Sequence, residues 1–561
     1  MGMNNFNSVK MVEIINPKVE VVDYGPKITD SNGKVIMTPD QLVYGAAGIT
    51  FKDTGFFEQA LGQIENEHIT DEQITDSLIT SVGGGHASLA TTPQIWFAIK
   101  GNASKMVDSI FTGAVYESAL MPSGRRIPIA KEQIVVPRGI AERGNEAVEL
   151  YMKTSVANID AYEKLMVNGV PKEEAAKIVQ YGHRGGGFLL MPLETLVSFA
   201  RDFRENPEAV PVEGREVLLQ IEDFIREHGM EKTYFGRLNA PRVSFPNPGI
   251  FHHGNNLTEV IESNLGGVSE RPIITHWNSS LSENGKRKIN DYLKKRSDIF
   301  SSPESIEKNW QNILGELDEI VKEYNNSVSL TTVANSPWRV WGEVKRHRTL
   351  RQSAESIYHA VDRGVRVAKN TGYFVREGKN EDLRFLFEEY NGIFSMPPAV
   401  KKDNDKLKLW LTRIADSLET YYKLKQMGVS ETDAVHVVPR GIKLGIEKKY
   451  DLYNLTLGYL SLRLCNTCEP EMRRTSEQER DLIIDSGIPQ QVKELLTPKC
   501  SYVGFCPEGS YKRCCGKVKT EVPDYDEAQH AGMQKRRREE IVYEIQGGRK
   551  SWFKNHQHFM R

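Results

Sequence analysis

The sequence contains an internal repeat, and a repeated segment constrains the fold because both copies are expected to form the same local structure. Residues Tyr162–Ala175 correspond to Tyr421–Ala434, with Tyr, Lys, Leu, Gly, Val and Ala at matching places. Each copy is typical of a helix that ends at a glycine, Gly169 or Gly428, and is followed by a second helix. A weaker similarity joins Thr91–Gly101 to Thr331–Gly342 in the same order. We therefore predict a tandem duplication; chance similarity of two amphipathic helices is the alternative.

Length and charge narrow the class of protein. With 561 residues, the chain is expected to form two to four domains. The 73 Lys and Arg residues nearly cancel the 75 Asp and Glu residues, so a global polyelectrolyte role is not expected, although a local basic patch is possible. Apolar stretches fall far short of the roughly 20 residues that span a bilayer, and the N-terminus has no apolar core of a signal peptide. We expect a cytoplasmic protein without a membrane partner.

The six cysteines all lie between Cys465 and Cys515. A secreted disulfide scaffold would spread its cysteines through the chain, so reduced thiols are expected. Thiolates in this number could hold a tetrahedral zinc ion, although the spacing is not that of a regular zinc ribbon. The candidate ligands are Cys465, Cys500, Cys506 and Cys515; ordinary buried thiols are the alternative.

Composition shifts along the chain suggest four regions. These are a first copy over residues 1–235, a Pro-, Gly-, Asn- and Ser-rich linker or insert over 236–300, a second copy over 301–519, and a polar tail over 520–561. Apolar spacing predicts a helix beginning at Ser302-Pro303 and another over Leu407–Tyr421. Strands are expected over Val19–Asp23 and Ile95–Ile99. The predicted class is mixed α/β with helices predominant.

The densest group of chemically active side chains lies between Lys345 and Ser356. Four cationic groups fall within seven residues there and would repel one another on a bare surface. A phosphate or pyrophosphate ligand explains them better, and a solvated basic helix face is the alternative. Trp338 and Trp341 lie just upstream, so we expect an aromatic surface beside the positive charge, suited to a nucleotide or an isoalloxazine ring.

These residues carry a resemblance to a known family. Arg346-His347-Arg348, seven residues and then Ser356 resemble the RHR-x7-S signature of flavin-dependent thymidylate synthases. Further segments are similar to other parts of that family: Gly85–Ser88, Ser123–Arg126, the leucine-rich Leu460–Arg473, and the cysteine-bearing Cys500–Gly516.

The resemblance implies two tandem copies of that family's α/β (α+β) fold, arranged as a pseudo-dimer, and a homo-oligomer of duplicated chains. It also implies a reductive methylation of dUMP to dTMP. FAD would be the cofactor, with methylenetetrahydrofolate and NADPH as co-substrates. Nucleic acid is not an expected partner.

Site residues follow from the resemblance position by position. Arg346, His347 and Arg348 would contact the flavin and the nucleotide, and Ser356 would lie near the uracil. Arg463 would match the arginine that promotes ionisation of the uracil N3, where a guanidinium stabilises the anion; its alternative is a helix-end arginine paired with Glu469 or Glu471. The remaining expected contacts are His86 and Asn454 with the flavin, and Glu355, Ser123, Arg125 and Lys177 with the substrate.

The sequence departs from the family pattern differently in its two halves. The second copy has Tyr358 where the family has a nucleotide-binding arginine, Val435 or His436 where it has a phosphate-binding arginine, and Glu343 in place of a glutamine. The first copy keeps Arg125 and Lys177 but has Thr112–Val115 where RHR is expected. We therefore expect composite sites to which both copies contribute.

Two other functions are compatible with the sequence. One is flavin-dependent modification of another pyrimidine nucleotide, such as hydroxymethylation. The other is a non-catalytic nucleotide- or nucleic-acid-binding protein that uses Arg346–Arg351 and Lys535–Arg538, whose binding would depend steeply on salt.

Overall fold

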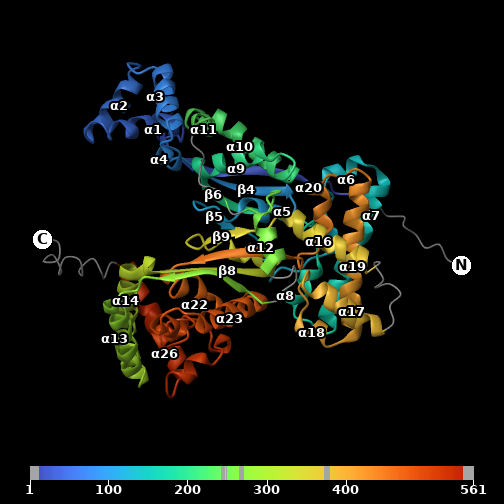
Figure 1. Ribbon diagram of the computed structural model, residues 1–561. Coiled ribbons are helices and arrows are strands. Elements are labelled where there is room, and N and C mark those ends of the chain that lie inside the picture. Colours follow the sequence, from blue (N-terminus) through green and yellow to red (C-terminus); the bar gives the residue numbers. More distant parts are fainter. Residues whose placement is uncertain (1–11, 242–246, 248, 265–270, 372–379, 547–561) are drawn as a thin grey trace. The chain divides into compact units, whose positions relative to one another are not determined.

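The computed structural model describes residues 12–241, 247, 249–264, 271–371 and 380–546, and these form a mixed α/β structure in which helices predominate (Figure 1). This is the class predicted from the sequence. The chain divides into two compact units. The first comprises residues 1–270, 335–348 and 352–446, and the second comprises residues 271–334, 349–351 and 447–561.

The first unit contains a four-stranded sheet in the order β1-β4-β6-β5. Its strands are antiparallel to their neighbours, and the predicted strands at 19–23 and 95–99 are confirmed as parts of the first two. Side chains of β4 alternate, with Ile95 and Phe97 buried and Trp96 exposed. Helix α10 packs on β1. Helix α9 packs on β6 (Figure 1). The bounds are β1 (Asn16–Gly25), β4 (Gln94–Asn102), β5 (Ser118–Leu120), β6 (Gly187–Pro192), α9 (Leu193–Glu205) and α10 (Val212–Glu227).

A small group of helices combines α1 to α4, which precede β4, with α11 from later in the chain. Helix α11 packs against α3, and α1 packs against α2. Thr38 and Thr70 each begin a helix with a capping box, because a glutamine three residues later returns a hydrogen bond to the threonine backbone. The bounds are β2 (Ile28–Thr29), β3 (Val35–Met37), α1 (Pro39–Gly48), α2 (Gly55–Glu65), α3 (Asp71–Gly83), α4 (Ala87–Thr91) and α11 (Glu231–Leu238).

A second sheet repeats the topology of the first. Its order is β7-β8-β10-β9. In each of the two sheets, the strand that comes first in the chain lies at one edge with the second beside it, and the strand that comes third lies at the other edge with the fourth beside it. The edge strand β7 and helices α12 and α13 fall inside the predicted linker at 236–300, which therefore contains regular structure. The Pro-, Gly- and Asn-rich run that precedes α12 gave the segment its linker-like composition. The bounds are α12 (Asn256–Asn264), β7 (Ile273–Ser279), α13 (Glu283–Ile299), β8 (Val328–Pro337), β9 (Arg351–Ala354) and β10 (Lys443–Tyr450).

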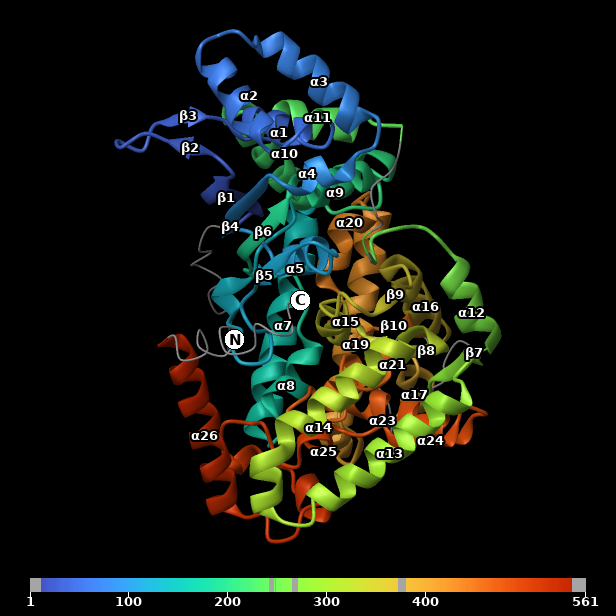
Figure 2. The same ribbon diagram turned by 90° about the vertical axis from the view of Figure 1, so that its left-hand side faces the viewer.

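The repeated segments found in the sequence form matching helices within the first unit. Helix α7 (Asn145–Val167) and helix α19 (Asn404–Gln426) have the same length and lie side by side (Figure 2). Each is followed at the same interval by a glycine, Gly169 or Gly428, with φ of +82°. Because this left-handed conformation suits glycine, both helices end as predicted. Each glycine leads into a short helix and a 3-10 turn: α8 (Lys172–Ala175) and η2 (Ala176–Ile178), or α20 (Glu431–Ala434) and η5 (Val435–Val437).

Corresponding residues of the two copies contact each other reciprocally. The amide of Gly182 donates to the carbonyl of His436 (3.1 Å), and the amide of Gly441 donates to the carbonyl of Lys177 (2.8 Å). Gly441 in the second copy corresponds to Gly182 in the first copy. In the same way, His436 corresponds to Lys177. On the facing helices, Asn158 Nδ2 donates to Ser417 Oγ (3.0 Å), and each is the fourteenth residue of its helix. Reciprocal contacts of this kind are those of a two-fold interface.

Further helices of the first unit surround these elements. Helices α16, α17 and α18 pack on α19, so the segment around 404–426 is covered on several sides. The remaining bounds in this unit are α5 (Met106–Phe111), α6 (Arg138–Glu142), α15 (Trp338–Val344), α16 (Ile357–Asn370), α17 (Asn380–Asn391) and α18 (Pro398–Lys401).

The second unit is mainly helical. Helix α14 (Pro303–Tyr324) begins at the predicted place, where Ser302 Oγ accepts from the Ser305 amide, and it lies beside α13 (Figure 2). The charge run in the tail lies on α26 (Glu527–Ile545), as the helix-face interpretation predicted. None of the helices in the described part of the chain combines the length and apolar composition of a membrane span. The other helices are α21 (Leu452–Leu455), α22 (Tyr459–Arg463), α23 (Pro470–Asp485), α24 (Gln490–Glu494) and α25 (Cys500–Val503).

The two reciprocal glycines give a matched pair of variants. A Cβ atom on Gly182 would lie 1.8 Å from Tyr151 Oη, whereas one on Gly441 would come no closer than 3.0 Å to the Lys177 carbonyl. We expect Gly182→Ala to lower the free energy of unfolding by about 2–3 kcal/mol, as overpacking does, and Gly441→Ala by about 1 kcal/mol. Urea unfolding measures both values.

Tyr151→Phe, added to Gly182→Ala, serves as the control because it removes the obstructing hydroxyl. The double variant should be more stable than Gly182→Ala alone. Equal losses for the two glycine variants would contradict this account of the packing.

Candidate functional site

The cationic segment Lys345–Arg348 lies against residues 108–117 of the first copy, within the first unit. Arg346 Nη2 lies 3.0 Å from Asp108 Oδ1. Arg348 donates from Nε to the Ala114 carbonyl (3.1 Å) and from Nη2 to Glu117 Oε1 (3.2 Å). Lys345 Nζ donates to the carbonyls of Asp108 and Ser109. The segment that follows α15 thus meets the corresponding segment that follows α5.

Helix α15 is anchored in the core just before this segment. Trp338 and Trp341 are both fully buried. Trp338 Nε1 donates to Ser109 Oγ (3.1 Å), and its ring centroid lies 4.3 Å from that of Tyr181. The expected exposed aromatic surface beside the positive charge is therefore wrong for these two tryptophans, because their rings fill the core. They fix the direction in which the cationic segment leaves the helix.

Other cations gather around the same segment. Lys105 Nζ donates to the Pro122 carbonyl (2.7 Å) and lies 3.1 Å from Asp108 Oδ2. Arg125 Nε lies 2.7 Å from Glu173 Oε2, and its Nη1 lies 4.0 Å from Glu343 Oε2. We call the whole group the basic cluster: Lys105, Arg125, Arg339, Lys345, Arg346, Arg348 and Arg440.

Arg440 and Arg339 complete this basic cluster. Arg440 Nη2 donates to the Ala176 carbonyl (2.9 Å). Arg440 also passes close to Gly124, since a Cβ atom added to Gly124 would lie 3.2 Å from Arg440 Nη1. Arg339 Nη2 lies 3.2 Å from Glu343 Oε1. The cations outnumber the carboxylates that face them, so the site has excess positive charge.

The protonation equilibria reflect this crowding. Burial, reinforced by the positive charge of Arg346, lowers the pKa of Lys345 to about 8. Burial acts to raise the pKa of Asp108, but the neighbouring Lys105, Arg346 and Lys345 hold it well below its usual value. Burial raises the pKa of Glu117 even though the Gly113 amide and Arg348 oppose the shift. A bound anion would relieve the repulsion among these cations.

Buried hydrogen-bond donors indicate what kind of group fits here. Among the buried side-chain atoms without a hydrogen-bond partner in the described part of the chain are two donors of the basic cluster, Arg339 Nε and Arg346 Nε. Leaving such donors unsatisfied costs free energy. A ligand rich in acceptors, such as a phosphate or the pyrophosphate of a flavin nucleotide, would suit these arginine donors.

The structure brings some of the other predicted residues to this site. Ser123 Oγ accepts from the amide of Arg125, which belongs to the basic cluster. Lys177 is fully buried and lies 3.5 Å from Glu174, and the residue before it, Ala176, accepts from Arg440. His347 is half-buried between the two arginines of the signature.

Three predicted residues have other surroundings. Glu355 is fully buried and accepts from Arg363 through both oxygens (2.6 and 2.9 Å) and from the Gly445 amide (2.9 Å). Ser356 is buried and caps α16 by accepting from the amide of Tyr358. His86 is exposed at the start of α4, and within the described residues no hydrogen bond or ion pair connects its ring to the basic cluster.

Asn454 and Arg463 belong to the second unit. Asn454 is buried, and its side chain donates to the Thr349 carbonyl (3.1 Å) and to Asp451 Oδ1 (3.0 Å). It therefore holds the residue that immediately follows Arg348 in the chain. Arg463 is half-buried at the end of α22, where Nη1 lies 3.7 Å from Cys468 Sγ and the guanidinium lies 5.8 Å from the ring centroid of Tyr459. The roles predicted for both residues remain predictions.

Five of the six cysteines line one small cavity of about 10 Å3 in the second unit: Cys465, Cys500, Cys506, Cys514 and Cys515. All six are free thiols. Burial raises the pKa of Cys500 and that of Cys506 to about 12, so these thiols stay protonated. Among the residues that the structure describes, no three His, Cys, Asp or Glu side chains are arranged to hold a metal ion. The zinc site at these cysteines stays an untested prediction.

Sequence reasoning missed several residues of the basic cluster and its counter-charges, including Lys105, Asp108, Glu117 and Arg440. None of them lies in a signature motif. Asp108 and Glu117 flank Thr112–Val115, so placing the two repeats against each other would have brought both acids opposite Lys345–Arg348. Nothing in the sequence pointed to Arg440.

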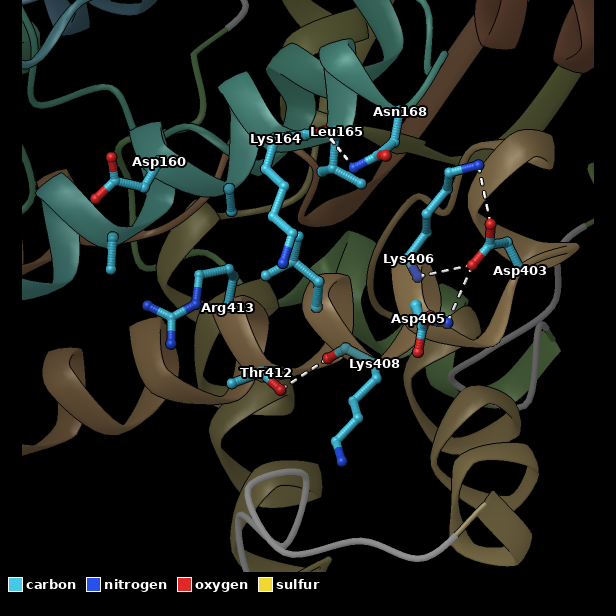
Figure 3. Close-up of a pocket in the computed structure, with 13 residues that line it drawn as sticks. Asp160, Lys164, Leu165, Asn168, Asp403, Asp405, Lys406, Lys408, Thr412 and Arg413 are labelled. Carbon is cyan, nitrogen blue, oxygen red and sulfur yellow. Dashed lines mark hydrogen bonds and ion pairs between the residues drawn. The ribbon is translucent and has the colours of Figure 1, made fainter.

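A separate cleft of about 850 Å3 lies between α7 and α19 (Figure 3). Some of its charged groups are already paired: Lys406 pairs with Asp403 (3.0 Å), and Asp403 also caps α19. Arg413 pairs with Asp416. The residues predicted from the sequence as site residues do not line this cleft, so the basic cluster is the better candidate site.

Comparison with known proteins places the C-terminal part of the chain in a family context. Residues 302–486 match the family model described as thymidylate synthase complementing protein. A flavin-dependent thymidylate synthase from Pyrococcus abyssi is 25% identical over 134 residues, covering 22% of this chain and 54% of that relative. The enzyme of the same name from Pyrococcus horikoshii is 30% identical over 123 residues, covering 22% and 50%. The resemblance predicted from RHR-x7-S is confirmed for this region.

These matches are partial. The chain spans about half the length of the curated relatives it matches. Among solved structures, a UMP/dUMP methylase PolB from Streptomyces cacaoi, bound with 5-Br dUMP, is similar at 14% identity with a TM-score of 0.31, covering 42% of this chain and 100% of that one. A TM-score this low does not establish a common fold.

The buried lysine of the site makes stability depend on alkaline pH. The pKa of Lys345 is about 8 in the folded chain, whereas its ordinary value is 10.5. Between pH 8 and pH 10.5 this lysine is therefore protonated in the unfolded chain and largely deprotonated in the folded chain. The free energy of unfolding should therefore rise by about 3 kcal/mol from pH 8 to pH 10.5 on account of this residue. Lys345→Met should remove that rise in urea unfolding curves.

Lys100→Met is the matched control, since Lys100 is exposed and pairs with Glu20 on the surface. Its pH dependence should follow that of the wild type. An unchanged slope in Lys345→Met would show that this lysine is not held uncharged by burial.

Proposed function

We propose that this protein is a flavin-dependent enzyme that reductively methylates dUMP to dTMP. Methylenetetrahydrofolate would supply the one-carbon unit, NADPH the reducing equivalents, and FAD would be the cofactor. The observation that carries the proposal is the basic cluster, in which Arg346 of the family signature and Lys105 of the first copy share Asp108, and Arg348 contacts Ala114 and Glu117 of the first copy. The similarity of residues 302–486 to thymidylate synthase relatives adds support.

Each group in the site has a defined task in this reaction. Arg346 and Arg348 would bind the anionic groups of flavin and nucleotide through directional, charge-assisted hydrogen bonds. Arg125 would hold the nucleotide phosphate, and His347 would donate to a flavin or nucleotide oxygen. Bound flavin supplies the hydride that reduces the one-carbon unit.

Activation of the uracil would fall to other residues. Arg463 would stabilise the negative charge that develops when uracil N3 ionises, which makes C5 nucleophilic. The uracil contacts predicted for Ser356 and Glu355 stay predictions, because Ser356 caps α16 beside the packed Tyr358 and Glu355 pairs with Arg363. His86 and Asn454 would complete the flavin contacts.

The organisation of the chain is part of the proposal. The matching strand orders and reciprocal hydrogen bonds support a tandem duplication that forms a pseudo-dimer within one chain, with copies predicted at 1–235 and 301–519; the sheet of the second copy would extend that copy back to β7. We infer a dimer of such chains. Six free thiols suit a reducing compartment such as the cytoplasm.

The first test is the visible absorption spectrum of the protein after addition of FAD and desalting, repeated with dUMP. We expect a retained flavin band that shifts when dUMP is added, because both ligands would share the basic cluster. Retained flavin that does not respond to dUMP, but responds to dCMP or UMP, would keep the flavoenzyme and replace the substrate. Absence of retained flavin would contradict the proposed function.

The composite nature of the site is tested by arginines from the two copies. Arg125→Ala and Arg348→Ala should each weaken dUMP binding by about 10- to 100-fold, because each removes a charge-assisted contact to the nucleotide. Calorimetric titration of the FAD-loaded protein gives the affinities. Arg126→Ala is the matched control, since Arg126 is the exposed neighbour of Arg125. If Arg125→Ala binds dUMP as the wild type does, the first copy does not contribute to the site.

A further inference from the structure

The internal repeat gives each principal cation of the basic cluster a counterpart at the corresponding place in the other copy. Lys345–Arg348 follow α15, and the uncharged Thr112–Val115 follow α5. Arg440 precedes the reciprocal Gly441, whereas Tyr181 precedes Gly182. Arg125 stands two residues after Ser123, and Tyr358 two residues after Ser356. These counterparts therefore carry no positive charge.

The counterpart of Lys177 stands among carboxylates. Lys177 and His436 are the middle residues of η2 and η5. His436 Nε2 lies 3.5 Å from Glu213 Oε1, and Glu213 Oε2 accepts from the Ser104 amide (3.0 Å). Asp433, which corresponds to Glu174, lies in the turn just before His436 and is also buried. We call the position that the repeat relates to the basic cluster the second place. It contains a buried carboxylate pair, Glu213 and Asp433, around a single histidine.

Negative charge is disfavoured at this second place. Burial raises the pKa of Asp433, and the charges of Glu213 and Glu142 raise it further. Burial likewise raises the pKa of Glu216, with repulsion from Glu213 and Asp433 added to it. A phosphate brought here would meet carboxylates that already repel one another, whereas at the basic cluster it would meet cations that repel one another.

Protein side chains also fill this second place. Tyr358 is 1% exposed, and its hydroxyl donates to the Ala209 carbonyl (2.5 Å). The Tyr358 ring stacks on His253 with centroids 5.2 Å apart. Gly139 approaches so closely that a Cβ atom on it would lie 2.1 Å from Asp433 Oδ2. Close packing of this kind leaves no room for a nucleotide.

We propose that each chain has one anion site, at the basic cluster, and that the place related to it by the internal repeat has become a packed, acidic support that binds no ligand. The identity of the anion as a nucleotide phosphate rests on the proposed function; the number of sites does not. A duplicated chain with two working sites would bind two anions, and this chain binds one.

Calorimetric titration of the full chain tests the number of sites with two probes, dUMP in the presence of FAD and inorganic pyrophosphate alone. We expect saturation at one equivalent per chain. Arg125→Ala should weaken the binding of each probe by about 10- to 100-fold. The matched variants at the second place, Tyr358→Phe and Glu213→Gln, should leave the affinity and the stoichiometry unchanged. Circular dichroism melting checks that each variant is folded.

The two proposals fail in different ways. Pyrophosphate that binds once per chain while dUMP does not bind would uphold the single anion site and reject the nucleotide function. Two equivalents per chain would overturn the single-site proposal while leaving a nucleotide enzyme in place. The single-site proposal would also be overturned if a folded Tyr358→Phe variant lost the binding of a probe while Arg125→Ala kept it. Absence of binding for both probes would overturn it as well.

Discussion

The ionic contact between Asp108 and the cations that surround it is the interaction on which the candidate site depends. Lys345 is fully buried, and removing an ammonium group from water costs several kcal/mol unless a counter-charge is near. Asp108 supplies that charge to Lys345, Lys105 and Arg346 together. Because Asp108 comes from the first copy and two of its partners from the second, the same contact joins the copies and assembles the basic cluster.

When two repeats of one chain contact each other, the residues on the two sides of the contact can differ, which is impossible in a homodimer. In a homodimer both copies of an interface carry identical residues, so a change at one site appears at the other. In this chain the corresponding positions are separate codons, and they differ: Arg440 faces the first copy where Tyr181 faces the second. The backbone contacts through Gly182 and Gly441 remain reciprocal while the side chains diverge. If the chain arose by duplication, as proposed, this combination of retained backbone contacts and altered side chains is what the loss of one of two sites would leave.

Local sequence signals predicted the elements that depend on local chemistry. The helices α7 and α19 end where Gly169 and Gly428 allow a left-handed residue, and α14 begins where Ser302 caps it. Burial could not be predicted in this way. Trp338 and Trp341 look like a ligand surface because they precede a cationic run, yet tertiary packing places both rings in the core.

The sequence predicted the second copy's cations better than their partners. Arg346 and Arg348 belong to a recognisable motif, which is why the sequence alone proposed them as site residues. Asp108 and Glu117 belong to no motif, and their role arises only because residues more than two hundred positions away fold against them. Long-range charge pairing of this kind is set by the fold, and a single sequence holds no local signal for it.

Glu343 shows how a departure from the family pattern changes the electrostatics of the site. It stands where the family has an uncharged glutamine, and its carboxylate lies 3.2 Å from Arg339 Nη2 and 4.0 Å from Arg125 Nη1. Glu173 holds Arg125 from the other side at 2.7 Å. A phosphate that binds Arg125 therefore has to compete with two carboxylates, which lowers the affinity gained from that contact. The carboxylates also hold the Arg125 guanidinium in one position. The loss of side-chain entropy therefore accompanies folding, and binding of a ligand does not have to order this side chain.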